Sequence, residues 1–475
     1  MQFFRQLLRR SLFEAIAITV ALAILVAPRA LHAEARLVVE ADTGRVLEAE
    51  NATVPWYPAS VTKLMTAYVT LKAVKDGTIT LDTLFTVSPV AASQSPSKMG
   101  FKPGTQITVD NALKMMLVKS ANDMAVVLAE GVGGSIDGFS GMMNQTAQKL
   151  GMTQSHYVNP NGLPADEQVT SARDLAILAR AIIKDLPEYE YFVHIPSIRF
   201  GRRVTQNFNK LIGRYPGADG FKTGFICASG YNLVASATRD GRRLIAVVLG
   251  ASSGTMRAVR AAQLLDRGFA SGGLTWLRPS LGTVDQLAPI DASPPNLRDE
   301  VCSGKRHKPA SDDDDAVLAS SAVNSSAPSP SSASGDGNNA MFLASGLQAP
   351  LPRPSEWLAA SPAPSEPIVV YTGPTRTGAS LIAAVAADSA NQDAATKRGK
   401  RSRVAAKKPT DAAAEPKADA AAKPKPAAVR HANAKPDAAA KPATTDASVA
   451  KPAKPKAATK PKATPKTSGE TKPAG

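Results

Sequence analysis

The sequence predicts an α+β fold: an antiparallel β-sheet packed with helices, an all-helical subdomain and a long disordered C-terminal region. Two strand-like hairpins, near residues 37–49 and 231–249, enclose a block in which apolar residues recur at helical spacing. The last 80 residues, 396–475, contain no Phe, Trp or Tyr and consist mostly of Ala, Lys, Pro and Thr. Such a segment buries too little apolar surface to offset the entropy lost on ordering, so we expect it to be disordered.

Turn residues and helix caps predict the order of the elements. Asp-Thr-Gly at 42–44 separates the strands of the first hairpin, and Asp-Gly at 240–241 separates those of the second. Between the hairpins we expect one helix over 60–77 and another over 110–130, which need not be unbroken. Serines that precede periodic apolar segments are expected to cap two further helices, namely Ser135 and Ser171.

The formal net charge of +16 is concentrated in the C-terminal tail. Residues 396–475 hold 16 Lys, 4 Arg and 6 acidic residues, a net charge of +14, so the other 395 residues carry only about +2. This distribution excludes a strongly basic folded domain, because the excess positive charge belongs to a segment that we expect not to fold.

Residues 1–35 are typical of a cleavable secretory signal peptide. Positively charged residues between Arg5 and Arg10 precede an apolar run over 15–27, and small residues follow at Ala33 and Ala35. The run is short for a transmembrane helix, although an uncleaved signal anchor is the alternative. We therefore expect export to the periplasm and leave association with the cell envelope open.

The chain contains two cysteines, Cys227 and Cys302. An oxidising compartment permits them to pair, and such a bridge would attach the end of the folded part to its core. We favour a disulfide between them over the alternative of two free thiols.

The composition changes beyond the segment that we expect to fold, residues 36–290. A Ser/Ala/Pro-rich linker spans 291–366, a short apolar island spans 367–390, and the disordered Lys/Ala/Pro-rich tail spans 391–475. The island has three interpretations: it docks on the domain, it docks on another protein, or it forms a weakly ordered strand and a helical turn with no separate role. We favour the third.

The motif Ser60-Val-Thr-Lys63 contains a nucleophile with its own base. Positions i and i+3 share one face of a helix, with Cβ atoms roughly 5–6 Å apart, so the Lys63 amine can reach the Ser60 oxygen. A serine is a poor nucleophile unless a neighbour removes its proton, which a lysine can do only when it is uncharged. Desolvation and a nearby cation would lower the pKa of Lys63 in the required direction.

The Ser-x-x-Lys pattern occurs at two further positions where the surrounding sequence does not favour a catalytic pair. The segment 95–98 contains a Pro and does not lead into an apolar helix, and the segment 448–451 lies in the tail. Only Ser60 stands at the start of an amphipathic helix, so it is the candidate nucleophile.

Two further motifs carry groups that such chemistry needs. Ser120-Ala-Asn122 lies in the later helical block and offers a hydroxyl and an amide, although an ordinary polar helix turn is the alternative. Lys222-Thr-Gly224 is expected to start a strand, where the cation and hydroxyl would bind a carboxylate.

Together, the three motifs resemble those of penicillin-binding serine peptidases, specifically the low-molecular-mass D-alanyl-D-alanine carboxypeptidases. They occur in the order of that family, with 60 residues from Ser60 to Ser120 and 102 from Ser120 to Lys222. The resemblance covers roughly residues 35–270 and implies that 36–290 is a serine DD-peptidase domain with a DD-peptidase/β-lactamase-like fold. The surrounding segments agree as well, namely 58–66, 119–123, 159–162, 219–224 and 230–236.

By this resemblance, Ser60 attacks the carbonyl between the two terminal D-alanines of a peptidoglycan stem peptide. The attack releases D-alanine and leaves an acyl-enzyme for water to hydrolyse. Lys63 is implied to be the general base, while Ser120 and Lys222 help to pass the proton to the departing amine. Lys222 is also implied to keep Lys63 uncharged by like-charge repulsion, and Asn122 to hold the acyl side chain.

The resemblance further implies groups that bind the oxyanion and the substrate carboxylate. The backbone N–H groups of Ser60 and Phe225 would form the oxyanion hole, and Gly224 would let the substrate lie close to the backbone. Thr223 and Arg257 would bind the free C-terminal carboxylate, to which a guanidinium is suited. The alternative for Arg257 is a solvated charge on a helix face. Some family members carry a polar residue in place of Phe225, so deacylation is expected to differ.

Three other functions share part of this pattern. A class A β-lactamase also needs a Glu followed by a Leu-Asn pair, and no such segment occurs between Asn122 and Lys222. A D,D-endopeptidase that cleaves cross-links has the same motifs, because they do not determine how open the cleft is. An exported binding protein with a basic tail is a third alternative. We favour the carboxypeptidase over these alternatives.

The expected partners are peptidoglycan stem peptides, with β-lactams as covalent inhibitors. No nucleic acid is expected, because it is not the resident polyanion of the periplasm. The basic tail is expected either to tether the protein to anionic envelope surfaces or to serve as a solubilising spacer. The chemistry requires no cofactor, and the five His residues show no paired spacing for a metal. Neither the second all-β domain nor the C-terminal membrane helix common in the family is evident.

Overall fold

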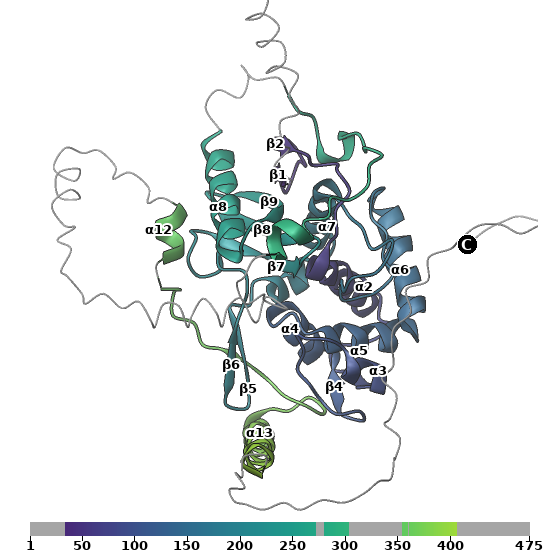
Figure 1. Ribbon diagram of the computed structural model, residues 1–475, viewed down its shortest axis with the longest axis vertical. Coiled ribbons are helices and arrows are strands. Elements are labelled where there is room, and N and C mark those ends of the chain that lie inside the picture. The colour runs from purple at the N-terminus through teal and green to yellow at the C-terminus, as the bar shows by residue number, and fades with distance from the viewer. Residues whose placement is uncertain (1–33, 272–279, 304–353, 360, 406–475) are drawn as a thin grey trace, which may run out of the picture. The chain divides into compact units, whose positions relative to one another are not determined.

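The computed structural model describes residues 34–271, 280–303, 354–359 and 361–405 (Figure 1). Residues 1–33 of the expected signal peptide, most of the expected linker and the tail beyond residue 405 lie outside these ranges. Across the described ranges, no helix has both the length and the apolar character needed to cross a bilayer.

A five-stranded antiparallel sheet forms the centre of the fold, in agreement with the predicted class. Its strand order is β2-β1-β9-β8-β7. Both predicted hairpins are confirmed, since β1 pairs with β2 and β8 pairs with β9. Asp240 and Gly241 both have positive φ, as the tight turn between β8 and β9 requires. The strands are β1 (Ala35–Glu40), β2 (Val46–Glu50), β7 (Ala218–Ile226), β8 (Gly230–Arg239) and β9 (Arg242–Ala251).

Helices cover both faces of this sheet (Figure 1). The helix α8 (Gly254–Ala270) packs on one face, and α7 (Ala172–Asp185) with the other helices packs on the opposite face. Successive side chains of a strand point to opposite faces, and β9 accordingly directs Val247 into one core and Val248 into the other. Strands buried on both faces explain the near-continuous apolar run of this hairpin.

The helical subdomain begins with the short helix η1 (Ala59–Thr62), which leads directly into α2 (Lys63–Lys75). Gly77 follows α2 with φ of +73°, as predicted for the end of this helix. The predicted caps are confirmed: Ser135 Oγ accepts from the N–H of Gly138 at the start of α6 (Ile136–Lys149), and Ser171 Oγ caps α7 in the same way. The subdomain also includes α3 (Pro89–Ser93), and η2 (Pro187–Val193) follows α7.

The helical block over 110–130 is two helices, α4 (Val109–Val118) and α5 (Asn122–Gly133). The chain breaks between them because Ser120 has φ of +61° and Ala121 is extended, conformations that cannot continue an α-helix. A neighbouring loop satisfies the exposed backbone groups: Ser97 Oγ donates to the carbonyl of Lys119, and the N–H of Asn122 donates to the carbonyl of Ser97.

The apolar island differs from our favoured expectation of weak order, because it is docked on the domain that contains the five-stranded sheet. Strand β10 (Ile368–Val370) pairs in parallel with β5 (Ser197–Phe200), which pairs with β6 (Arg203–Gln206). Val370 is fully buried, so the contact removes apolar surface from water as well as pairing a strand edge. The helix α13 (Gly378–Ala405) follows and runs past residue 390.

Short elements complete the described chain. Strands β3 (Leu84–Thr86) and β4 (Gln106–Thr108) form a two-stranded sheet. The 3-10 helix η4 (Val284–Gln286) and helix α9 (Arg298–Cys302) follow the sheet domain, and α12 (Pro354–Ala359) packs on α8 through Trp357 and Leu358.

The structure confirms the disulfide between Cys227 and Cys302, whose Cα atoms are 5.7 Å apart. The bond joins α9 to the turn after β7, and the N–H of Leu297 donates to the carbonyl of Ala228 in the same turn. The segment after the sheet domain is therefore attached beside the end of the strand that carries Lys222-Thr-Gly224.

Glu40 provides a test of the electrostatics at the end of β1. Arg45 and Arg242 hydrogen bond to its carboxylate at 2.7 and 2.8 Å, and these contacts, Arg45 first, lower the pKa of Glu40 from 4.5 to about 2. A carboxylate whose pKa is lower in the folded state than in the unfolded state stabilises the protein. This stabilisation is complete above the unfolded-state pKa and is lost as the pH falls through the folded-state pKa. We therefore expect Glu40→Gln to lower the free energy of unfolding by about 1–2 kcal/mol at pH 7, after allowance for solvent screening.

Urea unfolding at several pH values checks this expectation. The difference between wild type and Glu40→Gln should shrink between pH 4.5 and 2, and a difference that stayed constant over this range would contradict it. Glu50→Gln is the control, because the ion pair of Glu50 with Arg36 is exposed and should change stability by less than about 0.5 kcal/mol.

Candidate active site

The segment before the candidate nucleophile is held against β8 by hydrogen bonds. The indole N–H of Trp56 donates to the carbonyl of Ser229 at 3.0 Å. The Asn232 amide donates to the carbonyls of Tyr57 and Pro58 at 3.0 and 3.1 Å. These long-range contacts determine where η1 starts, and no motif in the sequence had identified Asn232 or Trp56 as positioning residues.

Ser60 and Lys63 meet as their spacing predicts. Lys63 Nζ lies 3.0 Å from Ser60 Oγ. The amine also lies 2.7 Å from Asn122 Oδ1 and 2.7 Å from the backbone carbonyl oxygen of Asn161. The Lys63 side chain is 0 % exposed, so neutral oxygens surround a nitrogen that burial has removed from water.

The loop that carries Asn161 packs directly beneath η1. A Cβ on Gly162 would lie 1.8 Å from the carbonyl oxygen of Ala59, and Gly162 has φ of +79°, so only glycine fits. The side chain of Asn161 donates to Gln94 Oε1 at 2.8 Å. Asn161 was not predicted as a site residue, because it contacts Lys63 through its backbone carbonyl, a group that every residue type has.

Ser120 lies in the break between α4 and α5 and is 3 % exposed. Its hydroxyl makes no hydrogen bond with any residue in the described ranges. We had expected Ser120 inside a helical block, but its positive φ turns the side chain out of the helical path. The structure thus holds a buried hydroxyl in an irregular turn, an energetically costly arrangement of the kind that is concentrated at functional sites.

Asn122 links Lys63 to the loop over 95–98. Its amide N–H donates to the carbonyl of Ser95 at 2.9 Å while its oxygen accepts from Lys63. Lys98 donates to the carbonyl of Ala92, so the second Ser-x-x-Lys spelling does not form a serine–lysine pair. This loop instead supports Asn122.

Asp123 anchors the same loop from the start of α5. Its carboxylate is fully buried and accepts from the N–H groups of Met99, Gly100 and Met124 at 2.8–3.0 Å. Burial raises the pKa of Asp123, and these three donors oppose the shift. Asp123 was included only in a segment that resembled the family, and its structural contacts explain its position next to Asn122.

Lys222, Thr223 and Gly224 lie in the interior of β7, which begins at Ala218, and not at the start of a strand as we expected. All three pair with β8. A Cβ on Gly224 would lie 2.9 Å from the backbone nitrogens of Ser60 and Val61. The strand and η1 therefore pack backbone against backbone.

Arg257 projects from α8 to the backbone of the same strand. It is 4 % exposed, donates to the carbonyl of Gly224 at 3.3 Å and lies 5.5 Å from the ring centroid of Tyr231. This burial excludes the alternative of a solvated charge on a helix face. The ring of Phe225 stacks on that of Tyr231, with centroids 4.2 Å apart, so the side chain of Phe225 contributes to packing.

The structure therefore joins Ser60, Lys63 and Asn122 by direct contacts and packs Gly224 on the nucleophile segment. Arg257 reaches the backbone of β7. Among the described residues, no group of three or more His, Cys, Asp or Glu side chains is arranged to hold a metal ion.

A family model and the relatives described below indicate the same protein family. The family model described as D-alanyl-D-alanine carboxypeptidase, Peptidase S11, matches residues 23–253. The match includes Ser60, Lys63 and Phe225, and it ends before Arg257.

Two curated relatives and one solved structure illustrate the similarity. D-alanyl-D-alanine carboxypeptidase DacC of Escherichia coli is 39% identical over 247 residues, covering 50% of this chain and 62% of the relative. DacB2 of Mycobacterium tuberculosis is 34% identical over 249 residues, covering 50% of this chain and 82% of the relative. Penicillin binding protein 5 from Haemophilus influenzae is 36% identical with a TM-score of 0.49, covering 52% of this chain and 73% of that chain. The matched region thus spans about three fifths of the length of the E. coli relative.

The close packing of β7 on η1 predicts that Gly224 tolerates no side chain. We expect Gly224→Ala to lower the free energy of unfolding by about 1–3 kcal/mol, because the new methyl group must push apart two backbones. Gly141→Ala is the matched control, since no atom lies within 4 Å of its Cβ position in α6 and alanine favours helices. Urea unfolding should show Gly141→Ala unchanged or stabilised, and equal effects of the two changes would contradict the packing argument.

Proposed function

The chain belongs to the Peptidase S11 family of D-alanyl-D-alanine carboxypeptidases, and on that premise we propose that it removes the terminal D-alanine from peptidoglycan stem pentapeptides. The observation that carries the proposal is the buried Lys63 amine, 3.0 Å from the hydroxyl of Ser60. This pair supplies the nucleophile and the base that acyl transfer requires.

The contacts of Lys63 can accommodate the uncharged amine that the proposal requires. A neutral amine has two N–H donors and one lone pair. Asn122 Oδ1 and the Asn161 carbonyl accept hydrogen bonds and cannot donate any, so they occupy the two donors. In the proposed uncharged form, the lone pair takes the proton of Ser60 Oγ, which lies 3.0 Å from Nζ. Burial disfavours the charged form of Lys63, and like-charge repulsion from Lys222 is proposed to act in the same direction.

In the acylation step, Lys63 takes the proton of Ser60 and Oγ attacks the carbonyl carbon of the penultimate D-alanine. The backbone N–H groups of Ser60 and Phe225 stabilise the oxyanion, a contribution of about 3–4 kcal/mol per donor in other acyl-transfer enzymes. The contact of Gly224 with the Ser60 backbone supports this assignment, because it brings the two backbone segments together.

The tetrahedral intermediate then collapses with cleavage of the peptide C–N bond. The proton held by Lys63 passes to the departing amine with the help of Ser120 and Lys222, and D-alanine leaves. The buried hydroxyl of Ser120, which has no hydrogen bond within the described part of the chain, supports a role in this relay. Water finally hydrolyses the ester on Ser60, which restores the hydroxyl.

Recognition of the substrate is assigned to Asn122, which holds the acyl side chain, and to Thr223 and Arg257, which bind the terminal carboxylate. The burial of Arg257 beside Gly224 supports this assignment. β-Lactams are proposed to acylate Ser60 as covalent inhibitors. A D,D-endopeptidase activity on cross-linked peptides is the second candidate, and a product assay with cross-linked and uncross-linked muropeptides separates the two.

The location and the tail belong to the same proposal. Residues 1–35 direct export to the periplasm, and the net charge of +14 over 396–475 attracts the tail to anionic envelope surfaces. If a protein without the tail were retained in the envelope at low salt as well as the full chain, the tail would be a solubilising spacer and not a tether.

A labelled penicillin tests the proposed nucleophile. We expect intact-mass analysis to show one covalent adduct, located in the peptide that contains Ser60, and Ser60→Ala to abolish both the adduct and D-alanine release. Ser95→Ala is the matched control, because Ser95 supports Asn122 only through its backbone carbonyl. An adduct that persisted in Ser60→Ala would exclude Ser60 as the nucleophile.

The carboxylate assignment predicts a substrate-dependent effect of Arg257→Ala. Loss of a charged hydrogen bond of about 2–4 kcal/mol should reduce kcat/KM for a peptide with a free C-terminus by about 30- to 1000-fold. Acylation by an esterified substrate, which has no free carboxylate, should fall much less. Arg257→Lys should restore part of the peptide activity, and equal losses on both substrates would contradict the assignment.

A further inference from the structure

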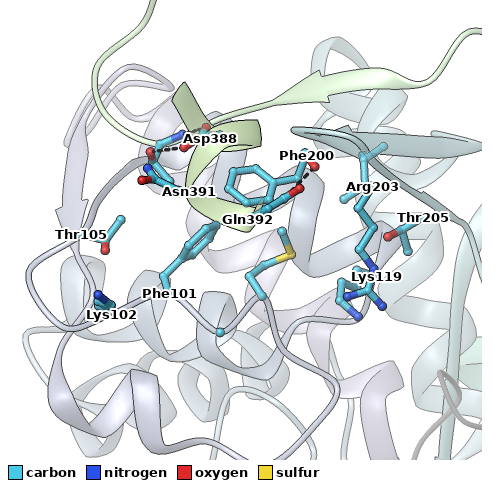
Figure 2. Close-up of a pocket in the computed structure, with 14 residues that line it drawn as sticks. Phe101, Lys102, Thr105, Lys119, Phe200, Arg203, Thr205, Asp388, Asn391 and Gln392 are labelled. Atoms are coloured by element: carbon cyan, nitrogen blue, oxygen red, sulfur yellow. Dashed lines mark hydrogen bonds between the residues drawn. The ribbon is translucent and has the colours of Figure 1, made fainter. Parts of the chain in front are cut away.

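A pocket of about 930 Å³ lies outside the Ser60–Lys63 site (Figure 2). Its walls come from four parts of the chain: the loop over 99–105, Lys119 at the end of α4, strands β5 and β6, and the C-terminal segment over 372–392. The volume is in the range of pockets that hold a small organic ligand or a few peptide residues.

The C-terminal wall is attached to the domain by specific contacts. The N–H of Gly373 donates to the carbonyl of Gln106 at 2.7 Å, next to the pairing of β10 with β5. The side-chain amide of Gln392, on α13, donates to the carbonyl of Phe200 at 3.0 Å. Because the family match ends at residue 253, this wall is an addition to the matched region.

One wall of the pocket is formed by the loop and the turn that support the candidate active site. Lys119 lines the pocket and immediately precedes Ser120. Met99 and Gly100 also line it, and their N–H groups bind the carboxylate of Asp123, next to Asn122. A ligand in the pocket would therefore lie against the turn that carries Ser120 and Asn122.

The lining has more positive than negative charge. Lys102, Lys119 and Arg203 are the cations, and the one lining carboxylate, Asp388, accepts hydrogen bonds from Thr372. Neither Lys102 nor Arg203 forms an ion pair with another described residue. In Figure 2, Lys119 and Arg203 lie at one end of the pocket and Lys102 lies at the other.

The middle of the pocket is apolar. The rings of Phe101 and Phe200 meet edge to face with centroids 5.2 Å apart, and Figure 2 shows both between the two cationic ends. A complementary ligand has an aliphatic portion for the rings and carboxylates for the cations.

We propose that this pocket binds the part of the stem peptide on the acyl side of the scissile bond, an acidic peptide segment, and that residues 372–392 form its outer wall. The inference rests on the proposed carboxypeptidase function, in which Asn122 faces the acyl side chain. A carboxylate of the peptide pairs with Arg203 and Lys119, and its aliphatic portion packs on Phe101 and Phe200. Arg203 and Lys119 thus make the enzyme selective for acidic stem peptides, and the C-terminal segment completes the pocket that holds them.

Kinetics with two substrates test the assignment of Arg203 in the full chain. The acidic substrate is L-Ala-γ-D-Glu-diaminopimelyl-D-Ala-D-Ala, and the short one is diacetyl-L-Lys-D-Ala-D-Ala, which lacks the acidic segment. We expect Arg203→Gln to reduce kcat/KM about tenfold for the acidic substrate and less than about twofold for the short one. Arg298→Gln, an exposed arginine outside the pocket, is the matched control and should change neither. Equal losses on both substrates, or no loss on either, would overturn the proposal.

Binding measurements separate this inference from the proposed function. In a Ser60→Ala background, calorimetry with the acidic pentapeptide should show affinity about tenfold weaker with Arg203→Gln and unchanged with Arg298→Gln. Gln392→Ala should weaken binding about threefold, because it releases the C-terminal wall from Phe200. Unchanged affinity in Gln392→Ala would exclude the wall, and unchanged affinity in Arg203→Gln would exclude the pocket. If the wild type released no D-alanine but bound the peptide through Arg203, the proposed function would fail and the pocket assignment would stand.

Discussion

The buried amine of Lys63 constrains the relative positions of the segments that form the candidate site. Lys63 is enclosed by a hydroxyl, an amide oxygen and a backbone carbonyl, each within 3.0 Å of its nitrogen. These three oxygens come from η1, from the start of α5 and from the loop over 159–162. Because a buried amine is costly unless its hydrogen bonds are satisfied, the three segments must meet at one point. The position of the proposed nucleophile follows from that requirement.

Glycines make this meeting possible. Gly162 and Gly224 approach η1 from two sides, and a methyl group at either position would collide with its backbone. The nucleophile segment therefore lies between a loop and the edge strand β7 without side chains in the contact. Asn232 and Trp56 then hold the preceding residues on β8, so the sheet itself positions η1. A rigid sheet suits this task, because a small displacement of a reacting group reduces the rate strongly.

The C-terminal segment lines a pocket next to the turn that carries Ser120. A single loop, which includes Ser97, Met99 and Gly100, contacts Asn122 and Asp123 on one side and lines the pocket on the other. Thr372, which follows β10, and helix α13 line that pocket although more than a hundred residues separate them from β9, the last strand of the sheet. A long linker permits such docking, because the entropy of closing a loop grows only slowly with its length.

Local patterns in the sequence determined the two hairpins, the Ser135 and Ser171 caps, and the contact of Ser60 with Lys63, because turn geometry and helical spacing act over a few residues. They also identified Cys227 and Cys302 as partners, since the chain has no others. Tertiary structure alone decided that Asn161 offers its carbonyl to Lys63, that Ser120 sits in a helix break, that Lys222 lies within a strand, and that the island docks on β5. Each of these four features depends on backbone groups or surfaces from segments that are far apart in the chain. Short sequence patterns do not predict such contacts.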